Sequence, residues 1–372
     1  MTCQSLAMIL PKVLALAFIC LTSFTAASPV DSEGEKWGSD LVVRQENSET
    51  QVRKEWRKLS DDEKLDWIDA VKCMMSKPAL NGAIYSGSRS RYGDFMALHI
   101  QAADYVHFNG PFLPWHRHLL ILWEQELRNT CGYAGSQPWW DFSLENTAET
   151  FPKSPLFDPL HGVGGNGPWV ENVSSIPVSN PAVILADRTG GGCLDNGPFA
   201  NLTVTMGIGN NLDYNPHCLR RDFCPELIAS ALSDERLAAV RNAPTFNDFN
   251  IAIQGKSLAV PDAVIHLGLH IGIGGQVGEL ADTWSSPGDP LFYIIHSTLD
   301  KLWNDWQRAD WDTRKSEISG PDAMWGYPFD FFGPIPYKNI TLDYSLNYTN
   351  FGSSVTIRSV MDIEALGYTY DD

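Results

Sequence analysis

Apolar residues recur at helical spacing in several stretches of this chain. In residues 51–76 they lie about one turn apart, at Trp56, Leu59, Leu65, Ile68, Val71 and Met75. The run Ser60-Asp61-Asp62-Glu63 has the form of a capping box, which predicts a helix that begins after Ser60. The same spacing predicts helices over residues 92–107, 116–128, 225–241, 261–271 and 289–308. The pattern therefore predicts a mainly α-helical protein.

The segments between these stretches lack helical spacing. Gly110, Pro111 and Pro114 interrupt the chain before His116, so we expect His116 to open the next helix. Residues 150–225 are rich in Gly, Pro and Asn, which predicts long connections with short β-like runs such as 202–206. Residues 337–348 and 354–360 have the composition of strands. We therefore expect long loops and a few short C-terminal strands around the helices.

The first 27 residues have the organisation of a secretory signal. Lys12 precedes an apolar run over residues 13–24, and Thr25-Ala26-Ala27 offers small residues for cleavage. This run is shorter than the roughly 20 residues that a spanning helix needs. No other segment could span a membrane, so we expect a secreted protein without membrane attachment after cleavage. Residues 28–50 are polar and predict a flexible N-terminal segment, which leaves residues 51–372 as a single domain.

Secretion changes what the cysteines and several asparagines predict. Five cysteines remain after loss of the signal, and an oxidising compartment favours disulfides among them, with an odd thiol left over. Cys193 can pair with Cys218 or with Cys224, because all three lie in the Gly/Pro-rich region. Four sequons predict glycosylation at Asn172, Asn201, Asn339 and Asn347. The formal net charge of −18, with no basic patch, excludes nucleic acid as a partner.

Histidine is the residue type that carries the most information about chemistry. Six of the nine histidines fall into two clusters, His99, His107 and His116 and then His266, His270 and His296. Neutral imidazole is the commonest protein ligand for the later first-row metals. Three nitrogen donors in each cluster, with no carboxylate or thiolate in the pattern, suit copper or zinc. Two such clusters predict a pair of metal ions.

The second cluster begins with a pair spaced for one helix face. His266 and His270 are four residues apart, which places both imidazoles one turn apart on the same face. A zinc protease would need Glu directly after the first of them, and Leu267 stands there. His296 lies in an apolar helix, where by itself it would be read as a core histidine. His217 lies in a Gly/Pro-rich loop and is expected to face solvent.

Three longer motifs resemble those of a known family. They read Phe112-Leu-Pro-Trp-His-Arg, Pro138-Trp-Trp-Asp, and Asp289-Pro-Leu-Phe-Tyr with His296 and Asp300-Lys-Leu-Trp after it. Together they resemble the signatures of the type-3 copper proteins, which are tyrosinases, catechol oxidases and molluscan-type haemocyanins. The resemblance spans about residues 51–308 and is nearest to the short secreted fungal tyrosinases, whose opening helix is similar to residues 52–60.

The resemblance implies a four-helix bundle around a type-3 dicopper centre. One copper would be bound by His99, His107 and His116, and the other by His266, His270 and His296. With O2 as co-substrate, such a centre oxidises small phenolic substrates. We expect oxidation of o-diphenols to o-quinones, with weak monophenol ortho-hydroxylation left open. Four aromatic residues are candidates for the walls of the substrate pocket: Phe112, Trp115, Phe292 and Tyr293. Packing in the core is the simpler interpretation of each. Asp300 is expected either to support a ligand histidine or to pair with an Arg.

The chain also departs from the family pattern at several positions. Members with strong monophenol hydroxylation carry Asn after the first histidine of the second site and Glu in an earlier segment, and together these hold a water. Leu267 and Gln254 stand at these positions here, and neither is a base. Tyr105 replaces a thioether-forming Cys, and Thr283 replaces a blocking Phe. The chain also has no room for the shielding C-terminal domain of longer members, so we expect no lid domain.

Two other functions remain open at this point. The protein could be a tailoring oxidase of one phenolic or tyrosine-containing intermediate in a secondary-metabolite pathway. It could instead be an oxygen carrier, although carriers cover the dicopper site with an extra domain and form large assemblies. Ligand residues alone do not separate the two oxidase hypotheses.

Overall fold

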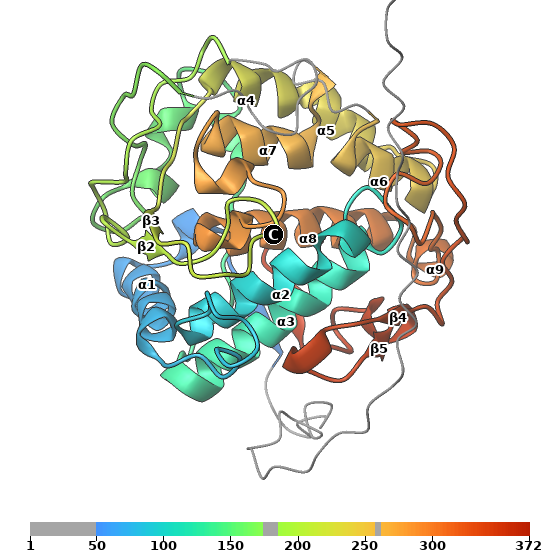
Figure 1. The fold of residues 1–372 in the computed structure, drawn as a ribbon. Helices are drawn as coiled ribbons and strands as arrows, with labels where there is room; N and C mark the ends of the chain where they lie inside the picture. The colour runs from blue at the N-terminus through green and yellow to red at the C-terminus, as the bar shows by residue number, and fades with distance from the viewer. Residues whose placement is uncertain (1–49, 174–184, 257–261) are drawn as a thin grey trace, which may run out of the picture. The chain divides into compact units, whose positions relative to one another are not determined.

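The computed structural model describes residues 50–173, 185–256 and 262–372 (Figure 1). The predicted signal and the polar segment over residues 28–50 lie outside the described residues, apart from residue 50. Within the described part, helices dominate and strands are few and short, so the predicted mainly α-helical fold is confirmed.

Four helices form the bundle at the centre of the described chain (Figure 1). They are α2 (Arg91–Val106), α3 (Phe112–Cys131), α7 (Ile265–Gly274) and α8 (Leu291–Ala309). Helix α3 packs along α8 and also contacts α2. The outer helices are α1 (Asp61–Ser76), α4 (Pro225–Ala231), α5 (Asp234–Arg241), α6 (Phe246–Gln254) and α9 (Trp311–Arg314). Helix α1 covers α2 and α3, while α4 and α6 cover α7.

Local capping chemistry explains where the helices begin and end. Ser60 accepts a hydrogen bond from the Glu63 backbone, and the Glu63 side chain accepts one from the Ser60 backbone, so the predicted capping box starts α1. Helix α3 ends at Gly132, which adopts the left-handed conformation at φ 69°.

The expectation that His116 opens a helix was wrong. Helix α3 begins at Phe112, and His116 lies one turn inside it. Pro111 is the N-cap and Pro114 lies in the first turn. The first-turn amides have no partner within a helix, so a proline costs nothing there and its fixed φ suits the helix.

Other predicted boundaries also shifted. Residues 51–60 are not helical but form strand β1 (Gln51–Arg53) and a 3-10 turn, η1 (Trp56–Lys58). The helix expected over residues 225–241 is two helices, because Ser233 accepts from the Arg236 amide and starts a new one. Helix α7 begins at Ile265, and α6 had not been predicted.

The strands pair in three small two-stranded sheets within the described residues. Strand β1 runs parallel to β6 (Tyr368–Tyr370), with Val52 opposite Thr369. The antiparallel pairs are β2 (Thr203–Val204) with β3 (His217–Cys218) and β4 (Ser345–Leu346) with β5 (Val355–Thr356). The remaining 3-10 turns are η2 (Phe142–Glu145), η3 (Phe151–Lys153), η4 (Pro155–Phe157), η6 (Glu279–Ala281), η7 (Ser286–Gly288), η8 (Thr349–Phe351) and η9 (Ile357–Val360). The few short strands predicted near the C-terminus are thus confirmed, although they are shorter than expected.

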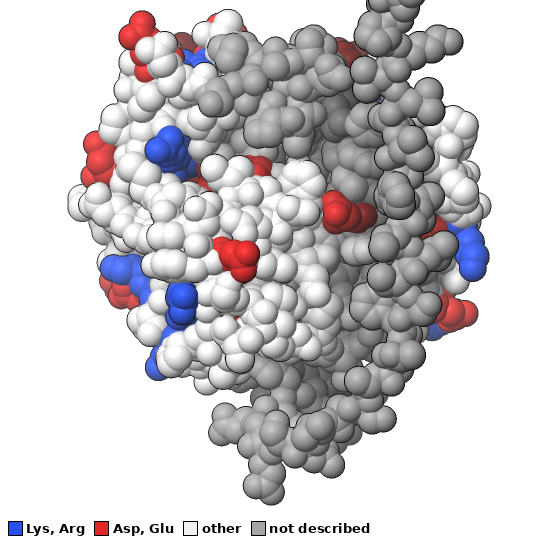
Figure 2. Space-filling view, in the orientation of Figure 1, with Lys and Arg blue, Asp and Glu red and all other residues white. Residues whose placement is uncertain are grey.

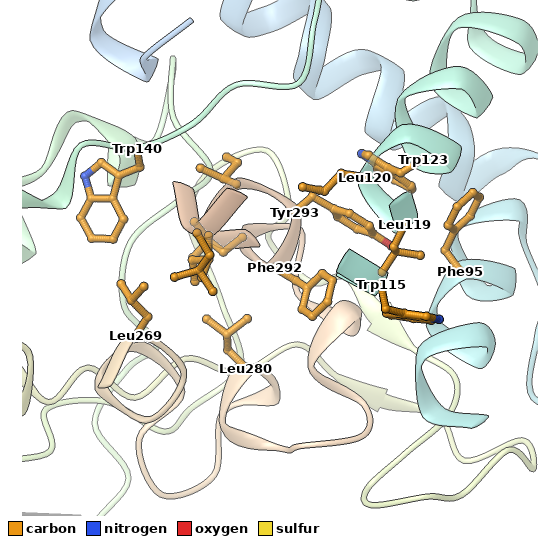
Figure 3. Close-up of a cluster of buried hydrophobic side chains, with 14 of the residues drawn as sticks. Phe95, Trp115, Leu119, Leu120, Trp123, Trp140, Leu269, Leu280, Phe292 and Tyr293 are labelled. Carbon is orange, nitrogen blue, oxygen red and sulfur yellow. The ribbon is translucent and has the colours of Figure 1, made fainter. Parts of the chain in front are cut away.

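An aromatic core lies between the helices of the bundle (Figure 3). Tyr293 of α8 stacks on Trp123 of α3 with ring centroids 3.8 Å apart, and Phe95 of α2 meets the same indole edge-on at 5.3 Å. Each buried aromatic side chain contributes a large apolar area, so these contacts fix the three helices against one another. Tyr293 and Trp123 therefore act in core packing.

Two disulfides and one buried thiol account for the five cysteines beyond the signal. Cys73 of α1 is bonded to Cys131 at the end of α3, and Cys193 is bonded to Cys218 of β3. Cys224 is free and buried. The pairing left open by the sequence is therefore Cys193 with Cys218. None of the described helices is long and apolar enough to cross a membrane.

The face shown in Figure 2 carries few charges. Uncharged residues cover most of the described surface in this view, and the few Lys and Arg side chains lie mainly toward its left edge, some of them beside acidic ones. No continuous basic area is visible there that would attract a polyanion.

Candidate metal centre

The first three histidines come from the two helices that frame one side of the bundle. His99 lies in the third turn of α2, His107 is the residue at which α2 ends, and His116 lies in α3. Their ring centroids are 5.1 Å apart for His99 and His107, 5.1 Å for His107 and His116, and 5.7 Å for His99 and His116. One nitrogen from each lies within 4.8 Å of the others, so these three can share one ion.

The second three histidines come from α7 and α8. His266 and His270 lie one turn apart on α7 with ring centroids at 4.5 Å, as their spacing predicts. His296 of α8 is 5.4 Å and 5.6 Å from them. Their donor nitrogens also lie within 4.8 Å of one another. The two triads face each other, since His116 stacks on His296 at 4.4 Å and His107 on His266 at 5.9 Å.

Burial keeps all six imidazoles neutral. It lowers the pKa of each, to about 4 for His107 and His270. Near neutral pH the lone pair of each ring is therefore available to a metal, and no competing proton has to be displaced.

Backbone carbonyls orient four of the six rings. The Nδ1 atoms of His107 and His116 bond to the carbonyl one turn earlier in the chain, each at 2.8 Å. Nδ1 of His99 bonds to the carbonyl of Trp284 at 2.7 Å, and Nδ1 of His270 to that of Leu280 at 2.6 Å. An Nδ1–H that donates to a carbonyl places the lone pair on Nε2, which is the usual arrangement of a metal-bound histidine.

Several ring nitrogens of the six histidines lack hydrogen-bond partners among the described residues. Nε2 of His99 and of His116 and both ring nitrogens of His266 are buried without a hydrogen bond. Nε2 of His270 lies 3.4 Å from Nε2 of His296. Buried polar atoms are rarely left unpaired in folded proteins, and metal coordination would satisfy one nitrogen of each ring. The chemistry of the donors thus fits two copper ions.

Two aromatic side chains of the core pack against both triads. Phe292 lies 4.1 Å from His296 and 4.9 Å from His99, and Phe112 lies 4.6 Å from His266 and 4.7 Å from His116, all between ring centroids. Both phenylalanines are fully buried. They hold the ligand rings in place and make the surroundings of the metals apolar.

The remaining candidate residues lie outside the triads. Asp300 accepts from Arg53 and Arg117 and so forms ion pairs, which was one of the two expected roles. Gln254 is buried: it accepts from the Phe108 amide at 2.6 Å and donates to the carbonyl of Asn109.

Leu267 is half-buried in a small apolar cluster with Cys224 and Ile271.

Sequence reasoning missed the groups that support the ligands. The carbonyls of Leu280 and Trp284 belong to the backbone, which no side-chain pattern reveals. The expectation that His217 faces solvent was wrong: its Nε2 lies 2.9 Å from Oε2 of the buried Glu279. The bond to Glu279 raises the pKa of His217, while burial raises the pKa of Glu279. An acidic residue about 60 positions away cannot be paired with a loop histidine from spacing alone.

A helical bundle that holds two buried histidine triads face to face is the arrangement of a type-3 dicopper protein. Residues 89–309 match the model of the common central domain of tyrosinase. The chain therefore belongs to the tyrosinase family, as the motifs of the sequence indicated.

Similar known proteins and a similar solved structure agree with this family assignment. The chain is 34% identical to N-acetyl-6-hydroxytryptophan oxidase of Emericella nidulans, over 88% of this chain and 94% of that protein. It is 33% identical to tyrosinase P of Aspergillus terreus, over 74% of this chain and 80% of that one. The structure of a polyphenol oxidase variant from Thermothelomyces thermophila superposes with a TM-score of 0.75 at 30% identity, covering 87% and 89% of the two chains.

Proposed function

We propose that this protein is a secreted oxidase that uses O2 to convert an o-diphenol into an o-quinone at a dicopper centre. The observation that carries the proposal is the pair of facing histidine triads, in which several buried ring nitrogens have no hydrogen-bond partner among the described residues. Copper, when bound, supplies the two-electron reduction of dioxygen. Each triad would hold one copper: His99, His107 and His116 the first, and His266, His270 and His296 the second.

The protein's own contribution is to position the donors and to exclude water. Carbonyl bonds to Nδ1 fix four of the rings, so that their Nε2 atoms are already in position to hold an ion. Phe112 and Phe292 keep the surroundings apolar and thereby limit the escape of reactive oxygen species. His266 and His270 of α7 are the most exposed of the six ligands, at 6% and 8%, which supports an approach of the phenol ring from the side of α7.

Oxygen uptake on a panel of phenols tests the proposal. Copper-loaded protein is expected to consume O2 with simple o-diphenols and to bind about two copper ions per chain. Monophenols of the same size are expected to react much more slowly. A well-folded product that retains two coppers but oxidises none of the o-diphenols would contradict the assigned reaction.

The preference for diphenols is proposed from the two positions that depart from the family pattern. Gln254 is neutral and already engaged with the backbone of Phe108 and Asn109. Leu267 offers no polar atom beside His266. Neither residue can help to deprotonate a monophenol.

Replacing Leu267 with Asn is therefore expected to raise monophenol activity relative to diphenol activity. The new amide would provide a group beside His266 that can hold a water. Since Leu267 is half-buried against Cys224 and Ile271, the variant should also lose some thermal stability. The measurement is the ratio of the two initial rates on a matched monophenol and diphenol. Leu267→Ala, which removes the side chain without adding the amide, is the control, and an equal ratio in both variants would disprove the argument.

A second candidate function is supported by the relatives. N-acetyl-6-hydroxytryptophan oxidase, as its name states, acts on a hydroxylated aromatic amino-acid derivative, and the match covers 94% of it. We propose as the alternative that this chain tailors one such intermediate of a secondary-metabolite pathway. Adding N-acylated hydroxyindoles and tyrosine peptides to the same panel separates the two functions. A kcat/KM for one of these that far exceeds that of every simple diphenol would favour the alternative.

Secretion and glycosylation are proposed on related grounds. The two disulfides fit an oxidising compartment. All four sequon asparagines, Asn172, Asn201, Asn339 and Asn347, are exposed, so each is accessible to the modifying enzyme. Mass spectrometry of secreted protein before and after deglycosylation would count the sites that are used.

A further inference from the structure

One short segment supports a ligand of each triad. It comprises residues 279–285, from the turn η6 to the residue before η7. Leu280 contributes the carbonyl that orients His270, and Trp284 contributes the carbonyl that orients His99. His107 and His116 instead use carbonyls one turn before them. The orientation of His99 thus depends on a peptide group outside its own helix.

The Trp284 carbonyl is held in place by Asp282. One carboxylate oxygen, Oδ1, accepts from the amides of Trp284 and of Ser285, each at 2.9 Å. The Ser285 amide and the Trp284 carbonyl belong to one planar trans peptide and point to opposite sides of it. When Asp282 binds the amide, it directs the carbonyl the other way, toward Nδ1 of His99.

The second oxygen of Asp282 anchors the turn to a neighbouring loop. Oδ2 accepts from the amide of Gly209 at 2.7 Å. The Trp284 indole adds an outer contact, since its Nε1 donates to Asp104 of α2 at 2.9 Å. The carboxylate of Asp282 therefore fixes the peptide plane and the position of the turn together.

The Leu280 carbonyl is held independently of this carboxylate. The Ala281 amide, which shares a peptide plane with the Leu280 carbonyl, donates to the backbone of Gly278 at 3.2 Å. The Leu280 side chain is fully buried and lies in the core beside Leu269 and Phe292 (Figure 3). Loss of the Asp282 carboxylate would thus weaken the bond between the Trp284 carbonyl and His99, while the bond between the Leu280 carbonyl and His270 would stay.

We propose that Asp282 is a positioning residue for the first copper site, which acts through the Trp284–Ser285 peptide on the ring of His99. The inference rests on the proposed assignment of the histidines as copper ligands. Groups that orient a metal-bound histidine typically contribute about 10- to 100-fold to metal affinity. An Asp282→Ala variant should therefore bind the first copper about 10- to 100-fold more weakly and retain the second.

The test is copper retention in the loaded protein during dialysis against increasing chelator. Copper per chain is counted, and electron paramagnetic resonance detects an isolated Cu(II), because a coupled pair of Cu(II) ions gives no signal. Wild type should lose its coppers without a long-lived one-copper species. Asp282→Ala should pass through a clear one-copper stage with a mononuclear signal. Asp158→Ala is the matched control: this exposed carboxylate caps a turn through the amides of Leu160 and His161, neither of which belongs to a triad.

Two further variants separate geometry from stability. Asp282→Asn keeps an oxygen that can accept from the Ser285 amide and should retain the first copper. Asp282→Glu keeps the charge, but its longer side chain places the carboxylate beyond the amides of Trp284 and Ser285. This variant should therefore behave as Asp282→Ala does. Asp282→Glu also supplies the test if Asp282→Ala fails to fold.

The site that loses copper can be identified in a His270→Ala background. There the remaining copper occupies the first triad, and adding Asp282→Ala should weaken its retention about 10- to 100-fold, while adding Asp158→Ala should not. Equal weakening of both sites, or unchanged retention of both, would overturn the inference. A wild type that binds fewer than two coppers would instead point to a failure of the ligand assignment.

Discussion

Replacing His270 with Ala is expected to abolish the oxidation of o-diphenols while the first triad still binds copper. The substitution removes one of three donors from the second triad, and the two that remain hold an ion far more weakly. Two electrons must pass to dioxygen together, so one copper alone does not support turnover. We expect oxygen uptake to fall below detection and copper to fall to about one ion per chain.

The fold should survive this substitution. It leaves the Leu280 carbonyl without its ring partner, a loss of about 1–3 kcal/mol for a buried group. His118→Ala is the matched control, because His118 lies in α3 two residues after His116 but packs on Tyr348 and belongs to neither triad. The control should keep two coppers and near-normal turnover. Wild-type turnover in His270→Ala would refute the ligand assignment.

Asp300→Ala is expected to produce the largest loss of stability. Asp300 lies in α8 one turn after His296 and is almost fully buried. It accepts from Arg117 of α3 and from Arg53 of β1. The hydroxyls of Tyr368 and Tyr370 in β6 also donate to it, at 2.6 Å and 2.7 Å. Burial by itself would raise the pKa of this carboxyl, but the two arginines and the two hydroxyls hold the pKa below its ordinary value.

Removal of Asp300 would leave the positive charges of two buried guanidinium groups with less negative charge nearby to balance them. Arg53 would keep Glu124 as a partner, while Arg117 would keep only neutral acceptors such as Gln307. Breaking a buried ion pair by deleting one partner costs about 3–5 kcal/mol. The measurement is the free energy of unfolding in urea.

A surface pair on the same helix provides the control for this prediction. Asp305 pairs with Lys301 at 2.7 Å, and its side chain is 49% exposed. An exposed pair of this kind contributes at most about 1 kcal/mol, so Asp305→Ala should be nearly neutral. A loss of stability in Asp300→Ala no greater than in Asp305→Ala would contradict the role of the buried network.

Much of the site was predictable because its ligands follow local geometry. The spacing of His266 and His270 places both rings on one face of a helix, and the motif around His116 identified the first triad. The helices of the bundle were visible as apolar repeats. Tyrosinase-family oxidases act on phenols, so the broad function also followed from the sequence.

The features that were missed depend on contacts distant in sequence or on the backbone. Residues 51–53 begin the stretch 51–76 for which helical spacing was found, but pairing with residues 368–370 and the burial of Arg53 draw them into a strand. Pro114 is usually read as a helix breaker, yet the first turn of α3 tolerates it. The support of His99 by the Trp284 carbonyl leaves no trace in residue type, because any side chain at position 284 would provide the same oxygen.

The bond between Cys73 and Cys131 has a consequence for the assembly of the centre. The loop that this disulfide closes contains all three histidines of the first triad. The histidines of the second triad lie outside this loop and outside the loop closed by Cys193 and Cys218. A cross-link spanning 58 residues lowers the entropy of the unfolded chain by an amount equivalent to about 4 kcal/mol. In a chain that has lost its helices, the first three imidazoles therefore stay confined to one closed loop, while the other three are held only by the open chain between them. Gathering the second set around an ion thus carries the larger entropic cost.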